Sequence, residues 1–91
     1  MASEQQIQTD IKTYLEYKGW FVFKIHQQSK FCFKGISDLI AVKDGITIFC
    51  EVKTATGKLR PEQISFMEQI QNHGAKYIIA RSLDDIREAV K

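Results

Sequence analysis

The chain has few of the residues that crosslink or interrupt a fold, because its 91 residues include only two cysteines and one proline. Cys32 and Cys50 form no C-x-x-C pair and have no further cysteine partners, so neither a disulfide scaffold nor a zinc module is indicated. Both thiols are expected to be reduced, with Cys50 acting as a small buried hydrophobe. No apolar run approaches the roughly 18 residues of a membrane span, and the N-terminus lacks the features of a signal peptide. We therefore expect a cytoplasmic protein with no membrane partner.

The composition is typical of a folded globular chain. It is 44% hydrophobic and 26% charged, a balance that excludes a disordered or fibrous protein. A chain of this length can build one hydrophobic core and no second one, and no repeat, low-complexity tract or linker divides it. The sequence therefore predicts a single domain over residues 1–91.

The formal net charge of +2 is unevenly distributed along the chain. Residues 24–60 carry seven basic and three acidic side chains, and acidic residues are in excess elsewhere. This local excess permits an anionic partner such as nucleic acid. Scattered lysines are, however, also typical of an ordinary solvated surface.

The periodicity of apolar residues predicts a first helix over residues 4–18. Apolar side chains recur every three or four positions from Ile7 to Leu15, Ser3 stands at the N-cap position, and Gly19 follows the last turn. The segment is therefore expected to form an amphipathic helix with one buried face.

Four further segments are rich in β-branched and aromatic residues and predict strands. They are residues 20–25, 36–42, 46–52 and 77–80. Pro61 and Gly74 bracket a second helix, and Ser82 is placed to cap a short terminal one. The predicted fold is α/β, with a mixed four-stranded sheet flanked by helices and the element order α-β-β-β-α-β-α.

The dipeptide Asp44-Gly45 separates two apolar runs and favours a two-residue hairpin turn. Counting outward from this turn sets Asp38 directly opposite Glu51, a pairing of like charges that destabilises a sheet. Lys53 lies two residues after Glu51 and therefore returns to the same face of the strand. The hairpin thus gathers three ionisable groups at one end of an otherwise apolar structure.

Two interpretations of this cluster are open. In the first, Asp38 and Glu51 form a hard, anionic oxygen site suited to Mg²⁺ or Mn²⁺, and Lys53 lies where a phosphate oxygen or an attacking water would be. In the second, the three groups form a structural ion triad that closes the sheet. A single lysine balances only one of two carboxylates, so the charge count favours a bound cation.

These residues carry a resemblance to a known family. The segments GISDLI (35–40), EVK (51–53) and GKLRPEQ (57–63), in this order of elements, resemble the VRR-NUC family of the PD-(D/E)XK nuclease superfamily. The resemblance covers nearly the whole chain and implies a restriction-endonuclease-like core. Ser37 stands where the superfamily's name has proline.

The resemblance also implies a division of roles at the hairpin end. Asp38 and Glu51 would bind Mg²⁺ or Mn²⁺ together with the backbone carbonyl of Val52, and Lys53 would position or activate the hydrolytic water. No small-molecule cofactor is implied.

Two further residues match active-site positions of the family. Glu4 matches an acidic residue of the first helix, and Gln63 matches a glutamine of the second helix. Without the resemblance, Glu4 is explained equally well as a favourable charge in a first helical turn, and Gln63 reads as an ordinary surface residue.

Basic residues flank this cluster on both sides. Lys30 and Lys34 lie beside Phe31 and Phe33, a combination of charge and aromatic rings suited to DNA, although both rings could instead fill a core or a subunit interface. We also expect DNA contacts from two basic residues that follow the third strand, Lys58 and Arg60. His26 is not assigned to catalysis.

The expected function is a divalent-metal-dependent endonuclease that hydrolyses DNA phosphodiester bonds. A chain of this size offers little surface for a duplex, so we expect a homodimer that acts on branched DNA such as a Holliday junction. A phage or prophage origin would fit the family. The alternatives are a catalytically silent DNA- or protein-binding module of the same fold and a sequence-specific restriction-type enzyme.

Overall fold

The computed structural model describes residues 2–25 and 33–91. Its elements are α1 (Glu4–Tyr17), β1 (Phe21–Lys24), β2 (Leu39–Lys43), β3 (Ile46–Val52), α2 (Pro61–Asn72), β4 (Lys76–Ala80) and α3 (Leu83–Ala89). This order confirms the predicted one. Within the described ranges, none of the helices has the length and apolar character needed to cross a bilayer.

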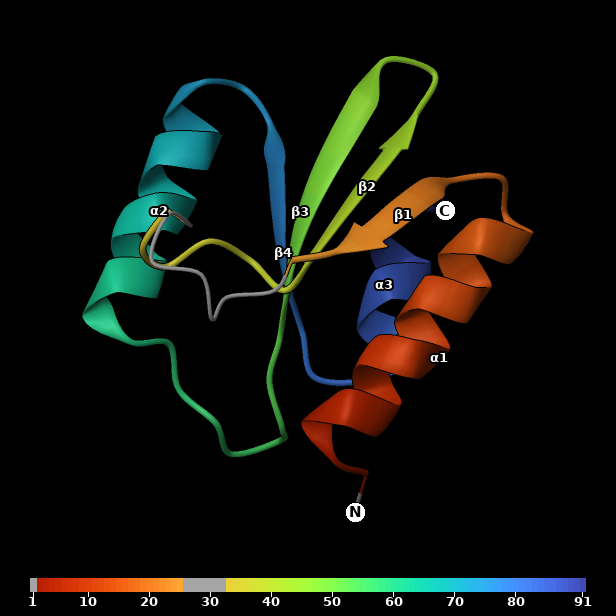
Figure 1. The fold of residues 1–91 in the computed structure, drawn as a ribbon, viewed down its shortest axis with the longest axis horizontal. Coiled ribbons are helices and arrows are strands. Elements are labelled where there is room, and N and C mark those ends of the chain that lie inside the picture. Colours follow the sequence, from red (N-terminus) through yellow and green to blue (C-terminus); the bar gives the residue numbers. More distant parts are fainter. Residues whose placement is uncertain (1, 26–32) are drawn as a thin grey trace.

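The four strands form one mixed sheet in the order β1-β2-β3-β4. The pairs β1–β2 and β2–β3 are antiparallel, whereas β3 and β4 are parallel and are connected through α2. The sheet lies between two helical layers, with α2 on one face and α1 and α3 on the other (Figure 1). The predicted fold class is confirmed.

The β2–β3 hairpin has the register that the sequence predicts. Asp44 and Gly45 both have positive φ, 52° and 80°, as a type I′ turn requires. Leu39 pairs with Cys50 and the ladder continues in register to the turn. Residues on alternate sides of these two strands therefore face opposite helical layers.

The face under α1 and α3 forms the hydrophobic core. Its buried side chains come from both helices and all four strands, and include Ile11, Leu39, Ile48 and Ile86. Cys50 lies in this core as a free thiol, and burial together with nearby carboxylates raises its pKa to about 12. The expectation that Cys50 packs as a small hydrophobe is confirmed, whereas Cys32 lies outside the described residues.

Aromatic rings form the contacts under α2. Phe66 of α2 lies 5.7 Å from the rings of Phe49 and Phe33 and 6.2 Å from that of Tyr77. Phe33 packs on Phe66 of α2 and is 65% exposed, so much of its ring faces solvent. Phe31 lies outside the described residues.

Two strands begin at residues other than the predicted ones for local reasons. β1 begins at Phe21 because the backbone N–H of Trp20 is used at the end of α1, where it donates to Leu15 O at 2.9 Å. The second strand begins at Leu39, after a turn at Gly35, and not at residue 36. Ser82 occupies the N-cap position of α3 without a side-chain cap.

Candidate active site

Asp38 and Glu51 lie together at the end of the hairpin that is farther from its turn. Asp38 directly precedes β2, just outside the hydrogen-bonded ladder, and its Oδ2 accepts a hydrogen bond from Val52 N at 2.7 Å. Glu51 is 2% exposed. The backbone of β3 thus holds the Asp38 carboxylate beside the end of the strand that carries Glu51.

The surroundings of Glu51 disfavour its charge. Burial raises the pKa of Glu51 to about 9, a hydrogen bond with Asp38 and the charges of Asp38 and Glu4 act in the same direction, and Lys53 opposes them. When Glu51 is ionised, its Oε1 has no hydrogen-bond donor among the described residues. The negative charge of the two adjacent carboxylates at this buried strand end must therefore be compensated by a proton or a cation.

Lys53 and Gln63 both approach the second carboxylate oxygen of Glu51. Lys53 Nζ lies 3.9 Å from Glu51 Oε2, and its side chain is 11% exposed. Gln63 Nε2 donates to the same oxygen at 3.3 Å, while Gln63 Oε1 accepts from Arg60 N at 2.8 Å. Gln63 is 2% exposed, so the interpretation of this residue as an ordinary surface side chain is wrong.

Glu4 is the exposed first residue of α1, and its charge contributes to the raised pKa of Glu51. The structure therefore places Glu4 close enough to affect the acidic pair electrostatically. Gln8 follows one helical turn later, and its Oε1 is buried without a hydrogen-bond partner among the described residues. Helical spacing from Glu4 is the sequence signal that could have identified Gln8.

Gly35 brings the chain before Asp38 against the first turn of α2. It has a φ of 82°, and a Cβ at this position would overlap the carbonyl oxygen of Glu62. Glycine therefore allows the segment with Asp38 and the helix with Gln63 to approach so closely. Ser37, in the same segment, is fully buried, and its hydroxyl donates to Leu39 O at 3.2 Å.

Arg81 holds the loop that follows Lys53. Its Nη1 donates to Thr54 O at 2.7 Å and to Gly57 O at 2.6 Å. A Cβ at Gly57 would lie 3.5 Å from Cδ of Lys53, so the clamped loop lies against the lysine stem. Sequence reasoning missed Arg81, because it follows β4 and nothing in its local sequence indicates this contact.

Tyr77 is a further polar group beside the acids that the sequence did not single out. Its hydroxyl is buried and has no hydrogen-bond partner among the described residues. Burial, followed by the charges of Glu51 and Asp38, raises the pKa of Tyr77 well above its ordinary value. The hydroxyl therefore stays protonated and remains available as a donor.

Three of the four basic residues predicted to contact DNA are exposed in loops. Lys34 precedes Gly35, and Lys58 and Arg60 lie between β3 and α2, where Arg60 pairs with Glu62 at 3.5 Å. The β3–α2 loop lies at the same end of the sheet as the N-terminus of α1 (Figure 1). Lys30 and His26 lie outside the described residues.

The donor set fits a hard divalent cation. No group of three or more histidine, cysteine or acidic side chains arranged to hold a metal occurs in residues 2–25 and 33–91. A cation would therefore depend on Asp38, the unsatisfied oxygen of Glu51 and backbone carbonyls. Such a mixed oxygen set with remaining positions for water and phosphate suits Mg²⁺ or Mn²⁺.

A mixed sheet between helices, with two carboxylates and a lysine at the end of its hairpin, defines a nuclease-like α/β domain. The chain belongs to the VRR-NUC domain family, whose model matches residues 2–84. This membership confirms the resemblance drawn from the three sequence segments.

Two solved structures are similar in fold. One, named "VRR_NUC domain", has a TM-score of 0.82 and 24% identity, and the match covers 98% of this chain and 96% of that chain. Another, named "VRR_NUC domain protein", has a TM-score of 0.81 and 17% identity, with coverage of 99% and 86%. A search of curated proteins gives no match.

Proposed function

We propose that residues 1–91 form a single domain that acts as a divalent-metal-dependent DNA endonuclease. The observation that carries this proposal is the buried Glu51 beside Asp38, with an oxygen that lacks a donor and with Lys53 Nζ 3.9 Å from the other oxygen. Asp38, Glu51 and the carbonyl of Val52 would hold Mg²⁺ or Mn²⁺. When bound, the cation would stabilise the negative charge that develops on the scissile phosphate.

The residues around the acids perform the remaining steps. Lys53 orients a water molecule, whose oxygen bonds to phosphorus while a phosphorus–oxygen ester bond breaks, and the departing oxygen ends as a hydroxyl. Gln63 fixes Glu51 through its amide nitrogen and is itself fixed by Arg60 N. Glu4 adds negative charge at the same end of the domain.

DNA is the proposed substrate because exposed basic side chains surround this end of the sheet. Lys34, Lys58 and Arg60 lie on loops from which they can contact phosphates. Lys30 lies outside the described residues, and we propose it as a further DNA contact from its charge alone. We place the protein in the cytoplasm, where DNA of a cell or an infecting phage is accessible.

The finer proposal is a homodimer that cuts branched DNA such as a Holliday junction. Two cuts in two strands need two sites, which a two-fold dimer supplies. An exposed aromatic pair on the edge strand β1 supports pairing with a second copy: Phe21 is 67% and Phe23 37% exposed, and their ring centroids lie 5.5 Å apart. Rings this exposed are typical of contact surfaces between proteins.

The test compares cleavage of a four-way junction, a linear duplex and a single strand with Mg²⁺, with Mn²⁺ and with chelator. Wild type, Lys53→Ala and the matched surface variant Lys76→Ala are used, because Lys76 is exposed at the start of β4. We expect metal-dependent symmetric nicking of the junction by wild type and Lys76→Ala, and its loss in Lys53→Ala. Sedimentation of the same samples should give a dimer.

Other outcomes separate the parts of the proposal. Cutting of all substrates would retain the nuclease and reject the junction preference, and a monomer that cuts only single strands would reject the dimer. Absence of cleavage by a folded wild-type protein that binds DNA would favour the silent binding module. Unchanged cleavage by Lys53→Ala would remove Lys53 from the mechanism.

A further inference from the structure

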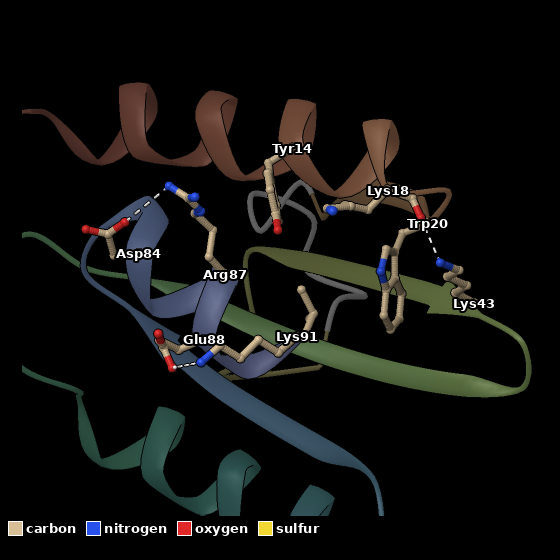
Figure 2. A pocket seen from close by; sticks show the side chains of 9 residues that line it. Tyr14, Lys18, Trp20, Lys43, Asp84, Arg87, Glu88 and Lys91 are labelled. Carbon is tan, nitrogen blue, oxygen red and sulfur yellow. Dashed lines mark hydrogen bonds and ion pairs between the residues drawn. The ribbon is translucent and has the colours of Figure 1, made fainter.

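A second basic site lies on the opposite helical layer, between the end of α1 and α3. A cavity of about 710 Å³ opens there, and side chains from α1, the hairpin and the C-terminal segment line it. Figure 2 shows Tyr14 pointing from α1 into the space between the two helices and Lys18 extending along α1 toward Tyr14, with Trp20 at the end nearer Lys43. We name this cavity the α1–α3 groove.

The charges of the α1–α3 groove favour an anion. It contains four basic side chains and two acidic ones. Each acid is paired within the C-terminal segment, Asp84 with Arg87 at 3.7 Å and Glu88 with Lys91 at 3.3 Å. Among the described residues, Lys18 and Lys43 form no ion pair with a carboxylate, so the groove keeps an excess of positive charge.

The two lysines near Trp20 are fixed in different ways. Lys43 Nζ donates to Lys18 O at 2.7 Å, which places its charge at the C-terminal end of α1. Lys18 Nζ lies 5.9 Å from the ring centre of Tyr14. The groove thus combines ammonium donors with the aromatic surfaces of Tyr14 and Trp20, a combination that suits a phosphate ester attached to a nucleoside.

We propose that the α1–α3 groove binds the sugar–phosphate backbone of a second segment of nucleic acid, with Lys18, Lys43 and Lys91 contacting phosphate and Trp20 contacting a base or sugar. This inference rests on the proposed function. The 14 residues of α1 separate the groove from Glu4 by about 20 Å, the length of roughly six base pairs. A strand or arm that leaves the candidate active site can therefore reach the groove.

Trp20 provides a direct test because it is the only tryptophan in the chain. Metal-free protein, kept from cleaving by chelator, is titrated with a four-way junction, a 30-base-pair duplex and a deoxynucleoside monophosphate, while Trp20 fluorescence and DNA anisotropy are recorded. Lys18→Gln and Lys91→Gln remove one charge from opposite walls of the groove. Lys76→Gln removes the same charge at the start of β4, from a residue that does not line the groove.

We expect DNA to quench Trp20 with the same midpoint as the anisotropy change. Lys18→Gln and Lys91→Gln should each weaken binding severalfold and lower the slope of log K against log salt by about 1, more than Lys76→Gln does. At saturating DNA with Mg²⁺, the control variant Lys76→Gln should cleave at the wild-type rate. Two variants are used because Lys18 lies at the C-cap of α1.

If the groove does not bind nucleic acid, the experiment gives one set of results; if the domain is not a nuclease, it gives another. DNA binding that leaves Trp20 fluorescence unchanged, or groove variants that match Lys76→Gln, would overturn the groove and leave the nuclease intact. If the monophosphate bound as tightly as DNA, the ligand of the groove would be a free nucleotide and not nucleic acid. A charge-dependent Trp20 response without cleavage in Mg²⁺ would support the groove and overturn the nuclease.

Discussion

The two faces of the sheet are built for different purposes. The face under α1 and α3 is aliphatic and closed, with Leu39 and Ile48 each 1% exposed. The face under α2 is aromatic and incompletely covered, and it carries Glu51, which burial holds away from its preferred ionised state. Because strand residues alternate, β3 supplies Cys50 to the first face and Glu51 to the second. Stability therefore comes mainly from one face, and the other retains groups that oppose it.

Substitution of either acid should have the largest effect on activity and a favourable effect on folding. Asp38→Asn or Glu51→Gln removes one of the two carboxylates proposed to hold the metal, so we expect cleavage to fall on the order of a thousandfold. Metal-free stability should be equal or higher, because a neutral amide has no charge to desolvate. Cleavage rates and denaturant unfolding with chelator measure the two effects.

Leu39→Ala is the matched control from the closed face, one residue after Asp38. It should lower the free energy of unfolding by about 2–5 kcal/mol, since it leaves a cavity in the core. A comparable loss of metal-free stability in Asp38→Asn would instead identify Asp38, Glu51 and Lys53 as a structural ion triad.

The pH dependence of the free energy of unfolding without metal should further distinguish the face that carries Glu51 from the aliphatic face. The pKa of Glu51 is about 9 in the folded protein and 4.5 as its ordinary value, so the folded state holds a proton that the unfolded chain releases. The stabilising contribution of this proton is complete below about pH 4.5 and is lost as the pH rises toward 9. Asp38, Glu4 and Lys53 are the charges that act on it.

Glu51→Gln is the reference for this measurement, because glutamine cannot titrate. Unfolding of both proteins from pH 5 to 9 with chelator should show wild type losing stability relative to the variant. Added Mg²⁺ at pH 8 should restore wild type alone, since a cation replaces the proton. Parallel pH curves for the two proteins would contradict the raised pKa of Glu51.

Local rules explain why the hairpin and its acids were predictable. Asp44-Gly45 sets the turn, the turn sets the register, and the strand period then brings Asp38, Glu51 and Lys53 to one place. Each step depends on residues close in the sequence. The order of elements followed in the same way from apolar periodicity and from caps such as Ser3, whose side chain accepts from Gln6 N.

Contacts between distant segments account for what the sequence did not show. The burial of Gln63 depends on the close approach of Gly35 to α2, and the clamp by Arg81 spans 24 residues to Gly57. The α1–α3 groove likewise joins α1, the hairpin and the C-terminal segment. Periodicity reports which face of a helix is buried, but not which residue from another element it meets.

The smallest effect on activity is predicted for substitution of Arg81. Arg81→Met keeps the aliphatic stem and removes the donors to Thr54 O and Gly57 O, so the loop beside Lys53 should loosen. We expect a decrease in kcat of about tenfold, because a small displacement of Lys53 misplaces the water that it orients. KM and metal affinity should change little, since neither acid moves.

The conservative variant distinguishes positioning from general destabilisation. Arg81→Lys can still donate to one of the two carbonyls, so it should recover part of kcat, whereas Lys76→Met at the start of the preceding strand β4 should leave kcat unchanged. If Arg81→Met lowered the melting temperature but left kcat at the wild-type value, Arg81 would be a structural tie of the loop alone. The site on the face under α2 would then tolerate movement of the loop beside Lys53, and cleavage would depend on the two carboxylates.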